Sequence, residues 1–307
     1  MDGRGEELMK AVIAGGSGFV GKHLAAELTN SGFEVVVLTR SPNAGAKFRE
    51  VKWDGKSQGD WAKEIDGATA VFNLSGAPID KKWTPEYQKV LVSSRTEPTR
   101  AIHEAIRASA VKPKTWVNAS AVGWYGDRGD EILSESDRIG EGFLSEVCQQ
   151  WEDAALVPDI PEVKQVCARI GIVLGNEGGV LGALIPLVKG FAGGAAGSGK
   201  QYLSVIHVKD LAKMLVWLVE AGQEGPINAC GPEPVTNSQL MAALRERFGR
   251  PPVPPAPAFV IKAATAAMGK EATVVLVSQR AVPTLALAQG FEFAFPTLNS
   301  ALDDLLS

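Results

Sequence analysis

The chain has 307 residues, and its 31 Lys and Arg against 35 Asp and Glu give a net charge of −4. With 45% hydrophobic and 21% charged residues it has an ordinary globular composition, which excludes disordered, collagen-like and coiled-coil chains. No run approaches the roughly 20 apolar residues of a membrane span, and the mild acidity predicts no attraction to nucleic acid or to an anionic membrane surface.

The cysteines and histidines are few, three of each. Cys148, Cys167 and Cys230 form no disulfide framework and no CxxC pair, and the histidines form no HExxH motif, so we expect no metal site. The polar, charged residues 1–8 lack the apolar region of a signal peptide. We therefore expect these residues to be a tail and the protein to be cytoplasmic.

Strand and helix patterns alternate up to about residue 175. Apolar, β-branched runs without helical spacing predict buried strands, and apolar residues at helical spacing predict the helices between them. Such alternation favours an α/β fold of the Rossmann type, with a doubly wound parallel sheet. The predicted strands are 10–14, 34–39, 70–74, 115–119 and 163–173, and the predicted helices are 19–30, 84–109, 142–156 and 209–220.

The sequence changes character after this point. Gly178–Gly199 is rich in glycine around a short apolar helix, and the proline-rich Pro251–Pro257 predicts a stiff extended segment. We predict a Rossmann core over 9–175, to which parts of 205–232 return. The rest, 176–307, is expected to form a smaller, mainly helical lobe that includes a helical tail, 251–307, with a cleft between the two.

A glycine-rich loop follows the first predicted strand and opens the first predicted helix. This context favours a dinucleotide-binding loop, in which glycines permit a positive φ and the approach of a pyrophosphate to the helix start. The alternative is a glycine-rich turn without a ligand. The loop residues are Gly15, Gly16, Ser17, Gly18, Phe19, Val20 and Gly21.

The end of the second strand indicates which dinucleotide is bound. An acidic residue there would bind the ribose hydroxyl of NAD, but the strand ends with Thr39 and Arg40. Arginine suits a 2′-phosphate, so the cofactor is predicted to be NADP(H). The alternative is a surface arginine that points into water.

Taken together, the motifs resemble those of the extended short-chain dehydrogenase/reductases. The chain is most similar to their atypical branch, the NAD-dependent epimerase/dehydratase-like "epimerase family" proteins with their own C-terminal helical domain. The resemblance covers residues 9–307. It rests on GGSGFVG at 15–21, NLSGA at 73–77, SSR at 93–95, ASAVGWYG at 119–126, GEGFLSEVCQQWE at 140–152, ARIGIVLG at 168–175 and GSGKQYLSVIHVKDLA at 197–212.

This resemblance implies roles for further residues around the cofactor. Leu74, Ser75 and Gly76 correspond to the loop that wraps its adenosine half. Arg95, on the following helix, is implied to reach the cofactor or a substrate anion, unless it is a solvated helix residue. Val173 ends a strand that is implied to lie beside the nicotinamide.

The resemblance also exposes a departure in the catalytic residues. Most of the superfamily carries Tyr and Lys in a YxxxK motif on one helix, where the Lys lowers the Tyr pKa for proton transfer. If Glu152 sets the register, Leu144 and Cys148 occupy these two positions. Neither residue can replace the usual one.

Two other residues could substitute in catalysis. Tyr125, just past the fifth predicted strand, could donate a proton or form a wall of the pocket. Ser120 lies where the superfamily places a helper hydroxyl, although that register could fall on Ala121 instead.

These observations predict an NADP(H)-binding oxidoreductase or nucleotide-sugar epimerase-like protein that acts on an unknown small molecule. The alternative is a non-catalytic NADP-binding protein that senses redox state or serves as a scaffold. The resemblance also implies a possible homodimer through the long helices 84–109 and 142–156.

Overall fold

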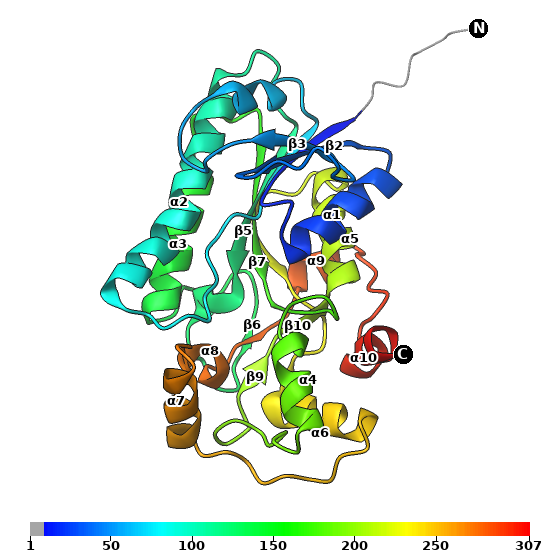
Figure 1. Ribbon diagram of the computed structural model, residues 1–307. Helices are drawn as coiled ribbons and strands as arrows, with labels where there is room; N and C mark the ends of the chain where they lie inside the picture. The colour runs from blue at the N-terminus through cyan, green and yellow to red at the C-terminus, as the bar shows by residue number, and fades with distance from the viewer. Residues whose placement is uncertain (1–8) are drawn as a thin grey trace, which may run out of the picture.

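The computed structural model describes residues 9–307, and the tail expected at residues 1–8 lies outside the described residues. Seven strands form one parallel sheet in the order β11-β7-β5-β4-β1-β2-β3, with helices on both faces (Figure 1). This confirms the predicted doubly wound fold. The strands are β1 (Lys10–Ala14), β2 (Glu34–Thr39), β3 (Arg49–Lys52), β4 (Ala70–Asn73), β5 (Thr115–Ala121), β7 (Lys164–Ile170) and β11 (Gly225–Ala229).

Two pairs of helices cover the sheet. α1 (Phe19–Asn30) packs beside α5 (Val208–Glu220), and α2 (Pro85–Ala108) packs beside α3 (Phe143–Ala155) on the opposite face (Figure 1). A hydrophobic core lies on each face of the sheet, and alternate residues of β1 point into one or the other. Ile13 belongs to the core with α1 and α5, and Val12 to the core with α2. Burial on both faces explains why the strands are apolar runs without polar alternation.

The strand predicted at 163–173 is two strands that separate at Gly171. β7 stays in the large sheet, while β8 (Ile172–Leu174) pairs with β10 (Val205–His207). A Cβ at Gly171 would lie 2.2 Å from the Ser204 carbonyl oxygen, so the chain needs glycine where it crosses this segment. β3, β11 and α6 (Asn237–Arg247) were not predicted from the sequence.

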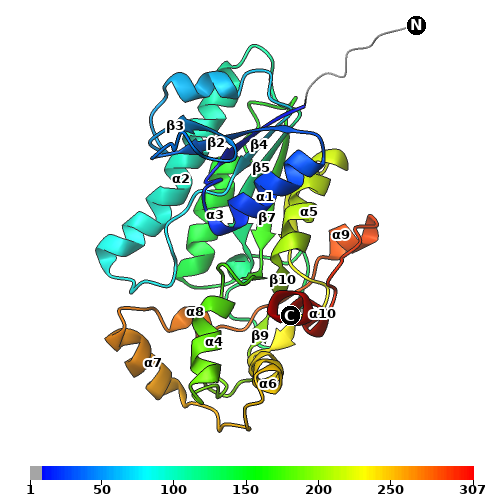
Figure 2. The ribbon, with the colours of Figure 1, turned by 45° about the vertical axis from the view of Figure 1, so that its right-hand side comes forward.

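Most of the remaining elements lie in a lobe below the sheet (Figure 2). Part of the predicted tail 251–307 leaves this lobe, because Ala286 and Phe291 pack into the sheet core with Ile227. The elements outside the main sheet and its four covering helices are α4 (Leu181–Lys189), α7 (Ala258–Ala267), α8 (Thr273–Leu276), α9 (Thr284–Ala288), α10 (Leu298–Leu306), β6 (Ile132–Leu133), β9 (Tyr202–Leu203), β12 (Val235–Thr236), β13 (Arg280–Ala281) and the 3₁₀ turns η1 (Asp60–Glu64) and η2 (Val122–Tyr125).

Candidate functional site

The loop 15–21 joins β1 to α1 in a turn too tight for side chains at several glycines. Gly15 has a φ of +78°, and a Cβ at Gly16 would lie 2.8 Å from Val37 Cγ1. At Gly21 a Cβ would lie 2.5 Å from the Gly15 carbonyl oxygen, so this glycine lets α1 begin directly against the loop. These are the close approaches that a dinucleotide-binding loop requires.

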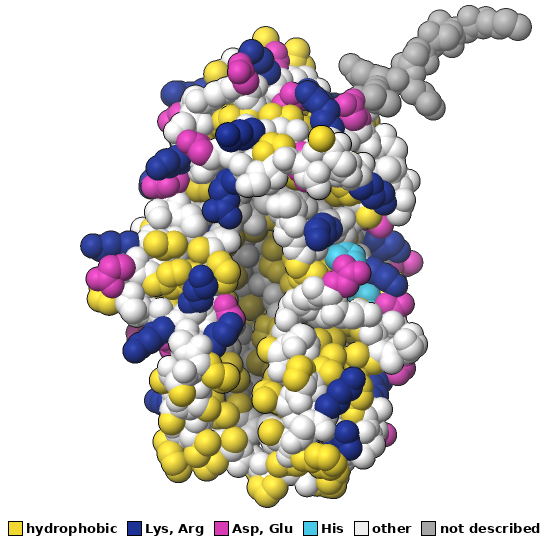
Figure 3. Space-filling model, in the orientation of Figure 1, with side chains coloured by type: hydrophobic (Ala, Val, Ile, Leu, Met, Phe, Trp, Pro, Cys, Tyr) yellow, Lys and Arg dark blue, Asp and Glu magenta, His cyan; other side chains and the backbone are white. Residues whose placement is uncertain are grey.

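The amino end of α1 is open to an anion. Its N-cap residue, Gly18, has no side chain to cap the helix, and the first turn contains no acidic residue. The free amides and the positive end of the helix dipole, which we call the phosphate seat, are therefore available to an anion beside Phe19 and Val20. Figure 3 shows a groove that passes this region and continues downward between α4 and α7–α8.

The loop after β4 lies against the glycine loop. The Leu74 amide donates to the Ala14 carbonyl at 2.9 Å, and a Cβ at Gly15 would lie 3.0 Å from the Leu74 carbonyl carbon. Ser75 is half-buried and Gly76 is exposed. The two loops follow β1 and β4, which are the neighbouring strands at the point where the strand order reverses, and ligands bind at such a switch point.

Thr39 is the last residue of β2, on the other side of β1, and Arg40 follows it. Arg40 is exposed and forms no hydrogen bond or ion pair within residues 9–307. A guanidinium without a protein partner is available to a phosphate, which it can bind through two parallel hydrogen bonds.

The segment after β8 packs on the start of α1. A Cβ at Gly175 would lie 2.4 Å, and one at Gly178 2.7 Å, from ring atoms of Phe19. Val173 is half-buried, and its carbonyl oxygen would lie 2.3 Å from a Cβ at Gly179. The glycines of this segment thus allow it to fold over the Phe19 ring beside the phosphate seat.

Three residues of α3, four apart, lie along the carboxyl end of β5. A Cβ at Gly123 would lie 3.6 Å from Leu144 Cβ and 3.5 Å from Cys148 Sγ, and Glu152 contacts Ser120. Leu144 and Cys148 therefore occupy the register that Glu152 sets. Burial raises the pKa of the Cys148 thiol to about 12, so the side chain is neutral at physiological pH.

Ser120 and Tyr125 belong to a buried polar network. Ser120 Oγ donates to Glu152 Oε1 at 2.6 Å, and Glu152 forms a two-point ion pair with Arg169, each bond 2.9 Å long. Arg169 Nη1 donates to the Tyr125 hydroxyl at 3.1 Å. That hydroxyl lies 2.7 Å from Asn228 Oδ1 and also contacts a backbone carbonyl.

The sequence reasoning missed Arg169 and Asn228, which complete this network. One signal was present in the sequence: Arg169 is a charged residue in the otherwise apolar run VCARIGIV. Its guanidinium also lies 4.0 Å from the ring centre of Trp124. Asn228 gave no comparable signal, because its strand, β11, reaches the site only through the sheet order.

Tyr125 is fully buried, and burial raises its pKa to about 12. Its hydroxyl is engaged by the network, and both roles expected for it, proton donor and pocket wall, stay predictions. We expect Tyr125→Phe to lower the free energy of unfolding by about 1–3 kcal/mol, because it leaves buried polar partners unsatisfied. Urea unfolding checks this. A variant of unchanged stability that lost a substrate-dependent rate would instead identify Tyr125 as a proton donor.

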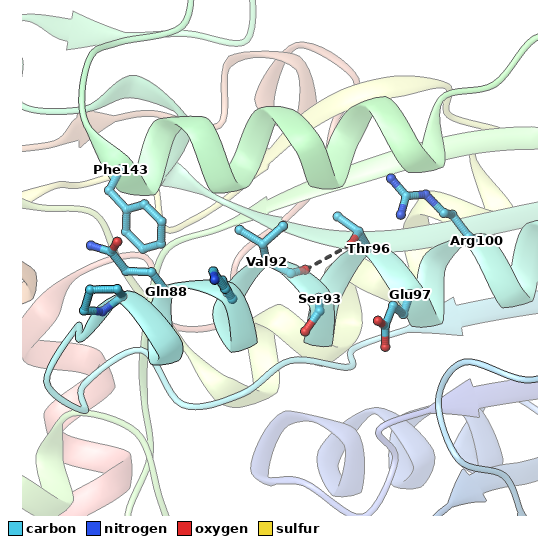
Figure 4. Close-up of a pocket in the computed structure, with 9 residues that line it drawn as sticks. Gln88, Val92, Ser93, Thr96, Glu97, Arg100 and Phe143 are labelled. Atoms are coloured by element: carbon cyan, nitrogen blue, oxygen red, sulfur yellow. Dashed lines mark hydrogen bonds between the residues drawn. The ribbon is translucent and has the colours of Figure 1, made fainter.

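An open groove of about 500 Å³ runs along the outer side of α2. In Figure 4 its side chains project from α2, with Phe143 contributed by the first turn of α3. The lining combines polar side chains with Pro85, Val92 and Phe143, and the homodimer expected through these helices stays a prediction. The lining residues are Pro85, Gln88, Lys89, Val92, Ser93, Thr96, Glu97, Arg100 and Phe143.

Residues 9–307 contain no group of three His, Cys, Asp or Glu side chains placed to hold a metal ion. Within the same residues, no helix combines the length and the apolar character needed to cross a membrane. Cys148, Cys167 and Cys230 are buried and unpaired. The cytoplasmic location expected from the sequence stays a prediction.

Comparison with known proteins gives consistent matches. The NAD dependent epimerase/dehydratase family profile matches residues 11–230, and a domain of unknown function, DUF1731, matches residues 256–305. The chain is 36% identical to the chloroplastic epimerase family protein SDR39U1 homolog of Arabidopsis thaliana, covering 97% of this chain and 86% of the relative. It is 33% identical to the epimerase family protein YfhF of Bacillus subtilis, covering 97% and 98%.

Solved structures agree with these relatives. The crystal structure of human epimerase family protein SDR39U1 with NADPH matches with a TM-score of 0.87 and 31% identity, covering 97% of this chain and 99% of that one. MoeE5 in complex with UDP-glucuronic acid and NAD matches with a TM-score of 0.74. At 22% identity, the second match shows a common fold alone.

Proposed function

Because this chain belongs to the NAD-dependent epimerase/dehydratase family, in its atypical short-chain dehydrogenase/reductase branch, we propose that it is an NADP(H)-dependent oxidoreductase or nucleotide-sugar epimerase-like enzyme. The open phosphate seat at the start of α1 carries the proposal, and the unpaired guanidinium of Arg40, after the neighbouring strand β2, adds to it. The NADPH in the human SDR39U1 structure supports the choice of cofactor.

The residues present fit this cofactor. Gly15, Gly16 and Gly21 have no room for a Cβ, and the loop leaves the first amides of α1 to the pyrophosphate. Arg40 would hold the 2′-phosphate, and the loop beginning at Leu74 would cover the adenosine half. Bound NADP(H) supplies hydride exchange, whereas the protein binds and orients it.

The lower part of the groove favours a small substrate with an apolar portion. Figure 3 shows hydrophobic side chains on both sides of the groove there, over α4 and α7–α8. Three large apolar side chains are exposed there: Leu187 in α4, Phe259 in α7 and Met268 just after α7. A few Lys and Arg side chains stand among them, so a substrate with a polar or anionic end is compatible.

Thermal unfolding with NADPH, with NADH and without ligand tests the proposed function. A ligand at about 100 times its Kd should stabilise the fold by about 2.7 kcal/mol, which corresponds to a rise in Tm of roughly 5 °C. We expect this rise with NADPH and a smaller one with NADH at equal concentration. No rise with either nucleotide would contradict cofactor binding.

Arg40→Ala tests the choice between the two nucleotides. Losing a charged hydrogen-bond donor costs about 1.5–3 kcal/mol, so we expect the Kd of NADPH to rise at least about tenfold and that of NADH to stay within about twofold. Both are measured by calorimetric titration, with Arg100→Ala, an exposed arginine of α2, as the control. Equal losses for both nucleotides would refute the 2′-phosphate role.

The alternative function, a non-catalytic redox sensor or scaffold, is favoured by one observation. The positions of the usual Tyr and Lys hold Leu144 and the neutral thiol of Cys148. Tight NADPH binding without turnover on panels of carbonyl compounds and nucleotide sugars would support this alternative. A substrate-dependent consumption of NADPH would exclude it.

A further inference from the structure

Arg95 is a buried positive charge without a negative partner. The residue is only 8% exposed, and its guanidinium donates to the carbonyl oxygens of Leu91 at 3.0 Å and Ala77 at 3.2 Å. No carboxylate within residues 9–307 forms an ion pair with it. Because a buried charge is costly unless paired, a polar group of a ligand is expected to complete its surroundings.

The guanidinium lies between the loop after β4 and the helix α3. A Cβ at Gly76 would lie 3.3 Å from Arg95 Cζ, so the glycine makes room for it. On the other side, Cζ lies 5.1 Å from the ring centre of Trp151, which follows Cys148 by one helical turn. The charge of Arg95 opposes the rise in the pKa of Cys148 that burial causes, so the two side chains are within electrostatic reach.

We infer that Arg95 is the cation of this site: it enters from α2 the space that an ammonium at position 148 would take, and it binds the nicotinamide-side ribose of the cofactor. This inference rests on the proposed function, because it requires bound NADP(H). Two buried cations side by side repel each other. An arginine at position 95 and a lysine at position 148 therefore exclude each other, whereas Arg95 and the neutral Cys148 are compatible.

Moving the positive charge from position 95 on α2 to position 148 on α3 tests this inference. We expect Arg95→Met to raise the Kd of NADPH at least about tenfold, since it removes a charged donor. Adding Cys148→Lys to that variant should recover at least about threefold of the loss. Cys148→Lys alone should instead weaken NADPH binding and lower the Tm of the free protein. Arg100→Met, on the exposed side of the same helix, should change the Kd by less than about twofold.

One further variant separates the charge of Arg95 from its hydrogen bonds, and one further ligand shows which half of the cofactor Arg95 binds. Arg95→Gln can still donate to the carbonyls of Leu91 and Ala77, and we expect it to bind NADPH as weakly as Arg95→Met. Adenosine 2′,5′-bisphosphate, which lacks the nicotinamide side, should bind both variants within about twofold of the wild type. The Tm of each free protein shows that it is folded.

Three results would overturn the inference. NADPH affinity within twofold of wild type in Arg95→Met would mean that Arg95 does not bind the cofactor. An equal loss for adenosine 2′,5′-bisphosphate would place Arg95 at the adenosine half. If the folded double variant bound NADPH no better than Arg95→Met, the loss in Arg95→Met would not be due to the missing positive charge. If the wild type binds neither ligand, the proposed function fails, and this inference fails with it.

Discussion

Gly21→Ala is expected to remove most NADPH binding while the sheet stays folded. The new Cβ would lie 2.5 Å from both the Gly15 carbonyl oxygen and the Gly16 Cα, and neither backbone atom can move without opening the loop. α1 would shift away from the phosphate seat. Loss of one or two amide bonds to phosphate, at about 1.5–3 kcal/mol each, predicts an increase in the Kd of NADPH of roughly a hundredfold. Calorimetric titration measures it.

The same substitution at another helical glycine provides the control. Gly182 lies in α4, and beyond its own helical backbone and chain neighbours nothing lies within 4 Å of the position that its Cβ would take. Gly182→Ala should leave the NADPH Kd unchanged and stabilise the protein by up to about 1 kcal/mol, because alanine is the better helix former. Gly21→Ala should lower the free energy of unfolding by about 1–3 kcal/mol, because the new Cβ is forced against the backbone. An NADPH affinity within threefold of wild type would show that the loop tolerates a Cβ.

The sequence predicted the parts of the fold that depend on neighbouring residues. The loop 15–21 was recognisable because a positive φ and close backbone packing both require glycine, and both occur within seven residues. The strands β1, β2, β4 and β5 were recognisable because burial on both faces makes them continuous apolar runs. Boundaries were less certain, as the division of 163–173 at Gly171 shows.

The parts that could not be predicted depend on residues distant in sequence. Tyr125 meets Asn228 across 103 positions, and Glu152 meets Arg169 across a helix and a strand. No periodicity encodes such pairs. The pattern of α2 likewise did not show whether Arg95 faces water or the site, because the surroundings of that face are set by the loop after β4 and by α3.

The buried network has a consequence for how the site stays in place. Glu152 and Arg169 join α3 to β7 directly beneath the end of β5, and Ser120 and Tyr125 attach to the same pair. The ion pair therefore fixes the distance between α3 and the sheet one helical turn from Cys148. A protein that lost this pair would lose both stability and the alignment of its cofactor site.

We expect Arg169→Met to lower the free energy of unfolding by about 3–5 kcal/mol, because it leaves Glu152 charged and unpaired in the interior. The side chains of Arg169 and Glu152 are 3% and 4% exposed, so water cannot replace the lost partner. Urea unfolding followed by circular dichroism measures the change. Glu152→Met, which leaves the guanidinium unpaired, should cost a similar amount.

The double variant and a surface pair complete this test. Glu152→Met with Arg169→Met removes both charges, so its loss of stability should be clearly smaller than the sum of the two single losses. Arg49 and Glu64 form an ion pair of similar geometry in which the arginine side chain is 55% exposed. Arg49→Met should therefore cost less than about 1 kcal/mol. Equal losses for Arg49→Met and Arg169→Met would mean that burial does not set the energy of the inner pair.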